Sequence, residues 1–150
     1  MGAYERTQSA RWMWLVLIPC GAIIVAVWLA GPSVALNASV SILCLVILAC
    51  FSVFARLTIR ADADAVTWYF GWGFPGSAIP TNQIERAEVT KTNLFEGWGI
   101  HWTIWHGWVW NASGFQAVEI FKTDGGKLTL GTDDPQGLFQ AIERFRKGAA

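Results

Sequence analysis

The sequence is poor in charge, and one long stretch has none at all. Only 15% of the residues are charged, and eleven basic residues balance eleven acidic ones, so the net charge is zero. This composition excludes a polybasic nucleic-acid binder, and a hydrophobic share of 53% excludes a disordered chain. From Trp12 to Ala55, 44 consecutive residues lack Asp, Glu, Lys, Arg and His. The chain therefore divides into a polar N-terminal tail (1–11), an apolar block (12–56) and a mixed-charge domain (57–147).

Cysteine and histidine are also scarce, which limits the chemistry that the chain can perform. Three cysteines are too few for a disulfide-stapled scaffold, and all of them lie in the apolar block. They are Cys20, Cys44 and Cys50. The two histidines, His101 and His106, are five residues apart across a predicted strand end, so they are expected to face different sides. We therefore expect no enzyme, no metal site and no cofactor.

The apolar block breaks at residues 31–33, Gly-Pro-Ser, a good turn former. It leaves two segments, 12–30 and 34–55, each of which spans roughly 28–33 Å as a helix, the thickness of a bilayer's hydrocarbon core. A signal peptide is disfavoured because a second apolar segment follows at once. A buried soluble hairpin is disfavoured because the remaining residues are too few to cover it. The sequence predicts two transmembrane helices joined by a tight turn.

Basic residues flank both outer ends of this block, and the turn between the segments is uncharged. Arg6 and Arg11 precede it, and Arg56 and Arg60 follow it. Lys and Arg favour the cytoplasmic side, so both termini and the domain after Arg56 are expected in the cytoplasm, at the inner or plasma membrane. Indoles prefer the headgroup region. The predicted interface anchors are Arg11, Trp12, Trp14, Trp28 and Arg56.

Small residues recur at four-residue spacing in the first apolar segment, and such a face lets two helices approach closely. The predicted packing residues are Ala22, Ala26 and Ala30. Asn37, Ser39 and Ser41 follow the turn in the second segment. Two interpretations of these polar residues remain open: polar contacts between the helices, or contact with water close to the membrane surface.

The domain after Arg56 alternates apolar and polar residues in short runs, which is typical of strands. The predicted strands are 57–61, 66–70, 77–79, 84–91, 100–105, 108–112, 117–122 and 128–131. Turn-forming residues separate them, above all Asp-Gly-Gly at 124–126. Seven or eight short antiparallel strands predict a small sandwich or barrel.

The period then changes from two to that of a helix. Asp134 is a good N-cap and Pro135 suits the first helical position. Leu138, Ile142 and Phe145 follow at the spacing of one helix face, so an amphipathic helix is expected to pack on the strands. A helix cap is a better interpretation of Asp134 than a role in acid–base catalysis.

Several motifs in residues 57–147 together resemble the bacterial pleckstrin-homology-like (PH-like) family. The motifs are Gly-Trp-Gly-Ile at 97–100, Asn111 with Ser-Gly at 113–114, Ala-Val-Glu-Ile at 117–120 and Gly-Thr-Asp-Asp-Pro at 131–135. Ile79-Pro80, Ile84 and Ala-Glu-Val at 87–89 fit the same pattern. The resemblance implies a strongly bent seven-stranded sheet, capped by a C-terminal helix and often joined to membrane helices. It implies no defined activity.

Eukaryotic relatives of that fold often bind phosphoinositides through basic residues around the first strand pair. In this sequence the corresponding loop is taken as residues 62–64, Asp-Ala-Asp, which would repel an anionic headgroup. The family's usual basic residue after Gly-Trp-Gly-Ile is here His101. Headgroup binding is therefore not carried over from the family.

Tryptophan is unusually abundant, with ten in the chain and five between Trp98 and Trp110. In strand 100–105, Ile100, Trp102 and Ile104 share one face and the other residues share the opposite face. The tryptophans pack in their own domain, rest on the headgroup layer, or form a protein interface, and all three interpretations remain open. The candidate interaction surface is Trp98, His101, Trp105, Trp108 and Trp110.

Two functions follow from these patterns. The first is a non-enzymatic, membrane-anchored interaction module that binds a protein partner or a second copy of itself at the cytoplasmic face. The alternative is a PH-like domain that senses lipid at the inner leaflet.

Overall fold

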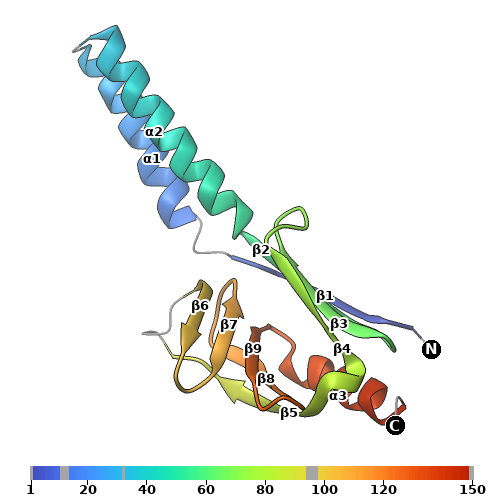
Figure 1. Ribbon diagram of the computed structural model, residues 1–150. Helices are drawn as coiled ribbons and strands as arrows, with labels where there is room; N and C mark the ends of the chain where they lie inside the picture. The colour runs from blue at the N-terminus through green and yellow to red at the C-terminus, as the bar shows by residue number, and fades with distance from the viewer. Residues whose placement is uncertain (1, 11–13, 32, 94–97, 149–150) are drawn as a thin grey trace.

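The protein consists of an apolar helical hairpin that projects from a β domain (Figure 1). The computed structural model describes residues 2–10, 14–31, 33–93 and 98–148. The β domain contains two sheets and a C-terminal helix. This agrees with the predicted order of helices first and a mostly β domain second.

The two helices of the hairpin are α1 (Trp14–Ala30) and α2 (Val34–Val53). The side chain of Ser33 caps α2, because its Oγ accepts a hydrogen bond from the amide of Leu36 at 3.2 Å. The break predicted at residues 31–33 therefore separates the helices, although Pro32 itself lies outside the described residues. Pro19 lies inside α1.

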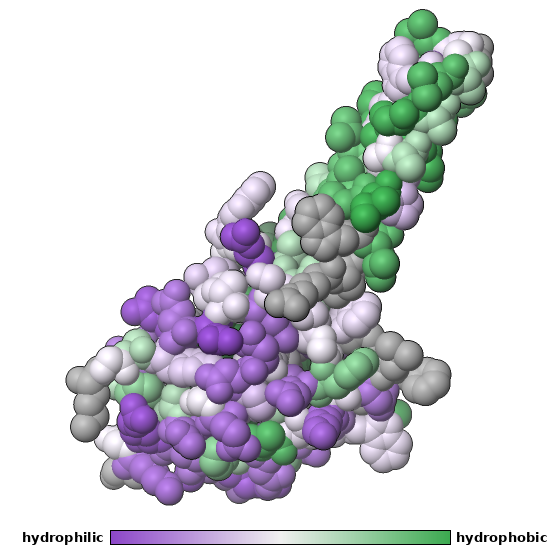
Figure 2. Space-filling view, turned by 180° about the vertical axis from the view of Figure 1, so that it is seen from behind, coloured by the Kyte–Doolittle hydropathy of each residue, from purple (hydrophilic) through white to green (hydrophobic). Residues whose placement is uncertain are grey.

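Length and composition distinguish the two helices. Among the described residues, α2 is the one helix long and apolar enough to cross a membrane, and only 11% of its most apolar window is buried. The described part of α1 is a shorter apolar helix. Residues 12 and 13 of the predicted first span are outside the described residues. Figure 2 shows the strongly hydrophobic surface of the molecule concentrated on the hairpin, above a mostly hydrophilic β domain.

The interface between α1 and α2 is not made by the predicted alanines. Ala22, Ala26 and Ala30 are exposed, so the packing prediction chose the wrong face of α1. Their four-residue spacing is a helical period, but it does not by itself identify the face that meets a neighbour. The side chains that are buried are Cys20 in α1 and Asn37 and Cys44 in α2.

The polar residues after the turn lie partly in this interface. Asn37 is buried, and Trp28 Nε1 donates to the Oγ of Ser41 at 3.1 Å. The Ser41 hydroxyl in turn donates to the backbone carbonyl of Asn37 at 2.8 Å. Ser39 is exposed and donates to the carbonyl of Ala35. Ser41 therefore makes a hydrogen bond between the helices, Asn37 is buried without a hydrogen bond to its Oδ1 from the described residues, and Ser39 faces outward.

The first sheet is built from strands that precede and follow the helical hairpin in the sequence. Its strands are β1 (Tyr4–Ser9), β2 (Arg56–Ala61), β3 (Ala65–Phe70) and β4 (Gly76–Pro80), in that spatial order. β1 pairs antiparallel with β2 from Tyr4↔Ala61 to Ser9↔Arg56. The segment predicted as a polar tail is therefore largely an edge strand, and the helical hairpin is an insertion between two paired strands.

The strand β1 was not predicted because it has no clear alternation. Its sequence, Tyr-Glu-Arg-Thr-Gln-Ser, contains one aromatic residue and is otherwise polar, as an exposed edge strand allows. Its pairing also changes which loop joins the first strand pair. That connection is the hairpin itself, whereas the acidic turn at residues 62–64 joins the second and third strands.

The second sheet has the order β5-β8-β9-β7-β6. Its strands are β5 (Ile84–Lys91), β6 (Gly99–Thr103), β7 (Gly107–Asn111), β8 (Gln116–Lys122) and β9 (Lys127–Gly131). All neighbours are antiparallel except β7 and β9, which are parallel. A short 3-10 helix, η2 (Thr81–Gln83), joins β4 to β5.

The two sheets and α3 (Pro135–Gly148) enclose one hydrophobic core. The amide of Gly137 donates to Asp134 Oδ1 at 3.0 Å, which confirms the predicted N-cap. Leu138 and Ile142 are fully buried against the sheets, as the predicted apolar face of the helix requires. Further core side chains from both sheets include Leu57, Ile59, Phe70, Ile120 and Leu130.

Candidate functional site

The β6–β7 hairpin carries the tryptophans that the sequence marked as a candidate surface. Its register pairs Ile100 with Trp110 and Trp102 with Trp108. Residues paired directly in an antiparallel ladder share one face of the sheet, so these four side chains lie on the same side. His101 pairs with Val109 and lies on the opposite side. The predicted surface is therefore divided between two faces.

Trp110 belongs to the core rather than to a free surface. Its ring lies 5.8 Å from that of Trp68 in an edge-to-face arrangement and 6.0 Å from that of Phe70 in a stacked arrangement. Such pairs add stability beyond the apolar area that they bury. Trp110 therefore packs against the core as a partly buried side chain, and His101 is also only partly exposed.

The end of the β6–β7 hairpin presents a continuous group of exposed apolar side chains, which we call the tip patch. Its members, with their exposed fractions, are Trp102 (60%), Ile104 (78%), Trp105 (74%) and Trp108 (53%). Strand alternation extended to residue 105 predicted Trp102 and Ile104 on one strand face and Trp105 on the other. The strand instead ends at Thr103, and the turn that follows directs both Ile104 and Trp105 outward.

Polar contacts with residues of β8 and β9 hold the turn that carries Trp105. Thr129 Oγ1 donates to the carbonyl of His106 at 3.0 Å, and Thr129 is fully buried. The buried carboxylate of Glu119 lies 3.4 Å from His106 Nδ1 and 3.7 Å from Lys127 Nζ. Lys127 Nζ also donates to the carbonyl of Trp105 at 3.4 Å. The tip patch is therefore built on a fixed turn.

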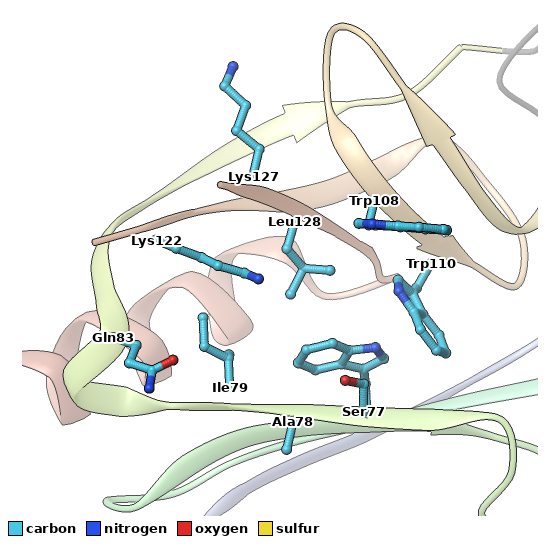
Figure 3. A pocket seen from close by; sticks show the side chains of 10 residues that line it. Ser77, Ala78, Ile79, Gln83, Trp108, Trp110, Lys122, Lys127 and Leu128 are labelled. Atoms are coloured by element: carbon cyan, nitrogen blue, oxygen red, sulfur yellow. The ribbon is translucent and has the colours of Figure 1, made fainter. Parts of the chain in front are cut away.

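A cavity of about 290 Å³ opens between the two sheets beside the tip patch. It is lined by Trp68, Ser77, Ala78, Ile79, Gln83, Trp108, Trp110, Lys122, Lys127 and Leu128. Figure 3 shows that Lys122 extends across the cavity wall toward Leu128, whereas Lys127 points away from it. Within the described ranges, no ion-pair partner of Lys122 is found. The cavity thus combines aromatic walls with one ammonium group.

The other end of β6 lies against the hairpin. Trp98, Gly99 and Ile100 line a shallow cavity together with Phe51 and Phe54, which stand at the end of α2. β6 runs away from this point, and Thr103 is roughly 13 Å further along the strand. Trp98 and Trp105 therefore lie beyond opposite ends of β6 and do not form one surface.

A second exposed aromatic pair, which the sequence did not single out, lies in the β3–β4 connection. We call residues 71–75 the aromatic loop. Trp72 is 100% exposed and Phe74 is 81% exposed. The loop lies beside the end of α2, since an added Cβ at Gly71 would stand 2.9 Å from the carbonyl oxygen of Val53. The run of glycine and aromatic residues at 71–74, between two predicted strands, was the available signal in the sequence.

The predicted interface anchors are placed as follows. Trp28 is half-exposed in the last turn of α1, close to the turn of the hairpin, and Arg56 is exposed at the start of β2, at the opposite end. Trp14 begins α1. Arg11 and Trp12 lie outside the described residues, so the structure does not bear on them.

The acidic turn between β2 and β3 is a self-contained structure. Asp62 Oδ1 accepts hydrogen bonds from the amides of Asp64 and Ala65, both at 3.0 Å. These bonds lower the pKa of Asp62. The turn lies at the end of β3 remote from the aromatic loop. In the part of the chain that the structure describes, no three His, Cys, Asp or Glu side chains are grouped to hold a metal ion.

No known protein-family model matches this chain, and no curated protein matches it significantly.

Proposed function

We propose that this chain is a non-enzymatic, membrane-anchored interaction module of PH-like type, held at the inner membrane with its β domain in the cytoplasm. The single observation that carries the proposal is the pairing of β1 with β2 on either side of the helical hairpin. The tip patch contacts a protein partner or a second copy of the chain.

The pairing of β1 and β2 means that either both helices cross a membrane or neither does. Because the strands belong to one sheet, both outer ends of the hairpin lie on the same side of any membrane. α2 alone satisfies the length and composition of a membrane span. If α2 crosses, α1 crosses back, and its 17 described residues already span roughly 26 Å as a helix.

The surface of the hairpin supports a lipid environment. Leu29 is 83% exposed and Leu15 is 76% exposed in α1, and Val34 is 74% exposed in α2. A contiguous apolar surface of this extent on a free protein would cause aggregation, whereas lipid tails solvate it without cost. The charges at its base favour a cytoplasmic β domain, since Arg56 and Arg60 follow α2 and the turn is uncharged.

The position of the tip patch supports a protein partner. Trp98 and Ile100 line a cavity with Phe54 at the end of α2, whereas Trp105 lies beyond the opposite end of β6. The tip patch is therefore separated by the length of β6 from lipid that would contact the end of α2. Tryptophan is enriched at protein interfaces because its large ring loses little conformational freedom on binding.

The first test is native mass spectrometry of the full-length chain released gently from its own membrane. We expect a discrete additional protein mass or a fixed multiple of 16.5 kDa. Trp102→Ala with Trp105→Ala is expected to abolish that species. Phe115→Ala is the matched control, because Phe115 is 45% exposed and lies outside the tip patch. A bare monomer from the wild-type chain, or an assembly indifferent to both tryptophans, would contradict the proposal.

The membrane topology is tested separately. A reporter fused after Ala150 is expected to be active only on the cytoplasmic side. A reporter placed between residues 31 and 33 is expected on the opposite side. Activity of the C-terminal reporter outside the cytoplasm would overturn the proposed orientation.

Lipid sensing remains a second candidate function, and the aromatic loop is the observation that favours it. Trp72 and Phe74 stand where the hairpin would leave the bilayer. A bare monomer that carries one selected lipid in the mass spectrum would favour this alternative over the protein partner.

A further inference from the structure

The aromatic loop is exposed in a way that its own domain does not explain. The indole side chain of Trp72 is 100% exposed, and the phenyl side chain of Phe74, two residues later, is 81% exposed. Trp105, the next most exposed of the tryptophans in the β domain, is 74% exposed. Burying such side chains would be favourable, so their exposure calls for a surface outside the β domain.

The loop is held in place rather than loosely attached. The amide of Gly71 donates to the carbonyl of Arg56 at 2.9 Å, and the amide of Gly73 donates to the carbonyl of Phe70 at 3.0 Å. The amide of Phe70 donates to the carbonyl of Pro75 at 2.8 Å, which closes the base. The two rings are therefore presented from a short, hydrogen-bonded turn.

The loop is also fixed against the hairpin. Phe70 packs edge-to-face on Phe54 at 5.2 Å, and Phe54 is the C-cap of α2. Gly71 approaches the backbone of Val53, the last residue of α2. In Figure 1 the β3–β4 connection projects from the sheet toward the hairpin, beside the base of α2. Trp72 and Phe74 thus stand at the level where α2 ends.

The distribution of charge over the domain agrees with a position of the aromatic loop next to lipid. Residues 71–76 contain no charged side chain, and Arg56, whose carbonyl accepts from the amide of Gly71, is exposed. At the other end of β3 the chain turns through Asp62 and Asp64. An uncharged aromatic end and an acidic end suit a domain with one side on a lipid surface that carries negative charge.

We propose that the aromatic loop is a second membrane contact, in which Trp72 and Phe74 enter the interfacial layer of the leaflet from which α2 emerges. The contact rests on the proposed membrane anchoring. Indole and phenyl rings are favoured in that layer, where one part of the ring is dry and its edge is hydrated. Together with the hairpin it fixes the tilt of the β domain, and so it directs the tip patch away from the bilayer.

The experiment uses the full-length chain with every tryptophan replaced by 5-fluorotryptophan, in lipid bicelles, observed by fluorine NMR. Trp72→Phe, Trp28→Phe and Trp105→Phe each remove one resonance and so assign it. Each resonance is then tested for broadening by a doxyl-labelled phosphatidylcholine and by a water-soluble gadolinium chelate. Phosphatidylcholine bicelles are compared with bicelles that also contain phosphatidylglycerol.

We expect the Trp72 resonance to be broadened by the doxyl lipid and protected from gadolinium, although Trp72 is the most exposed of the three in the folded chain. Trp105 is expected to show the reverse. Because the loop is uncharged, its behaviour is expected to be the same in both lipid compositions. Trp72→Ser combined with Phe74→Ser is expected to increase the gadolinium broadening of Trp98, which lies at the same end of the domain.

The outcomes separate this inference from the proposed function. If Trp28 and Trp72 are both broadened by gadolinium and not by doxyl lipid, the membrane anchoring itself fails. If Trp28 contacts lipid while Trp72 behaves like Trp105, the loop contact is wrong and the anchoring stands. A Trp72 contact that requires phosphatidylglycerol would overturn apolar insertion in favour of attraction to charged lipid.

Discussion

The amide of Ala10 donates a hydrogen bond to the carbonyl of Ala55 across 2.7 Å. These residues stand just after β1 and just before β2, so the bond closes the base of the helical hairpin at the point where it enters and leaves the sheet. Forty-five positions of sequence separate the two residues. The β domain and the hairpin are thereby joined as one unit, although the surface of the hairpin is mainly hydrophobic and that of the β domain mainly hydrophilic (Figure 2).

The N-terminal strand is expected to contribute measurably to domain stability. Gln8 is buried, and its Nε2 donates to the carbonyl of Ser113 at 2.6 Å. Gln8→Ala is expected to lower the free energy of unfolding of the β domain by about 1 kcal/mol, since the Ser113 carbonyl loses its donor. Denaturant unfolding of the full-length chain measures this. Glu5→Ala on the exposed face of β1 is the control, and equal effects would contradict a specific role for Gln8.

The close approach of the aromatic loop to α2 is expected to depend on glycine. Gly71 has φ +52°, and an added Cβ would meet the Val53 carbonyl oxygen at 2.9 Å. Gly71→Ala is expected to destabilise the chain more than Gly31→Ala. Gly31 has a similar φ of +59° but open space around it, so both variants carry the backbone strain of about 1–2 kcal/mol and only one adds a clash. Thermal unfolding compares the two, and equal losses would show that the contact is not needed.

The turn beneath the tip patch is expected to loosen when its buried donor is removed. Thr129→Val keeps the size of the side chain but leaves the His106 carbonyl without the Thr129 hydroxyl. We expect a loss of about 1–2 kcal/mol in stability, together with weaker assembly through Trp105. Thr67→Val on β3 is the control, as it is only half-buried. If the stability and the native mass spectra of Thr129→Val match those of the control, the hydrogen bond from Thr129 does not support the turn or the assembly.

Alkaline sensitivity is expected from Tyr4. Burial, followed by the nearby Asp134 carboxylate, raises the pKa of Tyr4 from 10.0 to about 12. Below pH 10 both the folded and unfolded states keep the phenol protonated, so its effect is constant. Between pH 10 and about 12 the unfolded state loses the proton first, so stability falls as pH rises. Tyr4→Phe is expected to flatten that part of a stability–pH curve, and an unchanged slope would assign the loss to other groups.

Much of the β domain could be predicted from the sequence because its strands alternate clearly. The strands after Arg56 begin and end within about two residues of the predicted limits, and Asp134 caps α3 as expected. These features depend on local patterns of a few residues. Pairing partners do not, and the parallel pairing of β7 with β9 was not predicted for that reason.

The candidate surface was harder to predict because it depends on where strands end. The structure ends β6 two residues before the predicted limit, which takes Ile104 and Trp105 out of the strand and into the turn that carries the tip patch. The polar strand β1 has no alternation of apolar and polar residues. The sequence therefore did not predict that the hairpin is inserted between two paired strands of one sheet. Without that placement, Trp72 and Phe74 were ordinary loop residues rather than neighbours of α2.

The insertion of the hairpin between β1 and β2 also imposes an order of assembly. During synthesis β1 emerges first, but its partner strand follows only after both apolar helices have left the ribosome. In the proposed membrane topology the sheet is therefore completed late, only when the helices have returned the chain to the side of the membrane on which β1 lies. A hairpin whose insertion stopped halfway would leave β1 unpaired and the core open at that edge, so under this proposal a closed β domain would mark a chain whose insertion is finished.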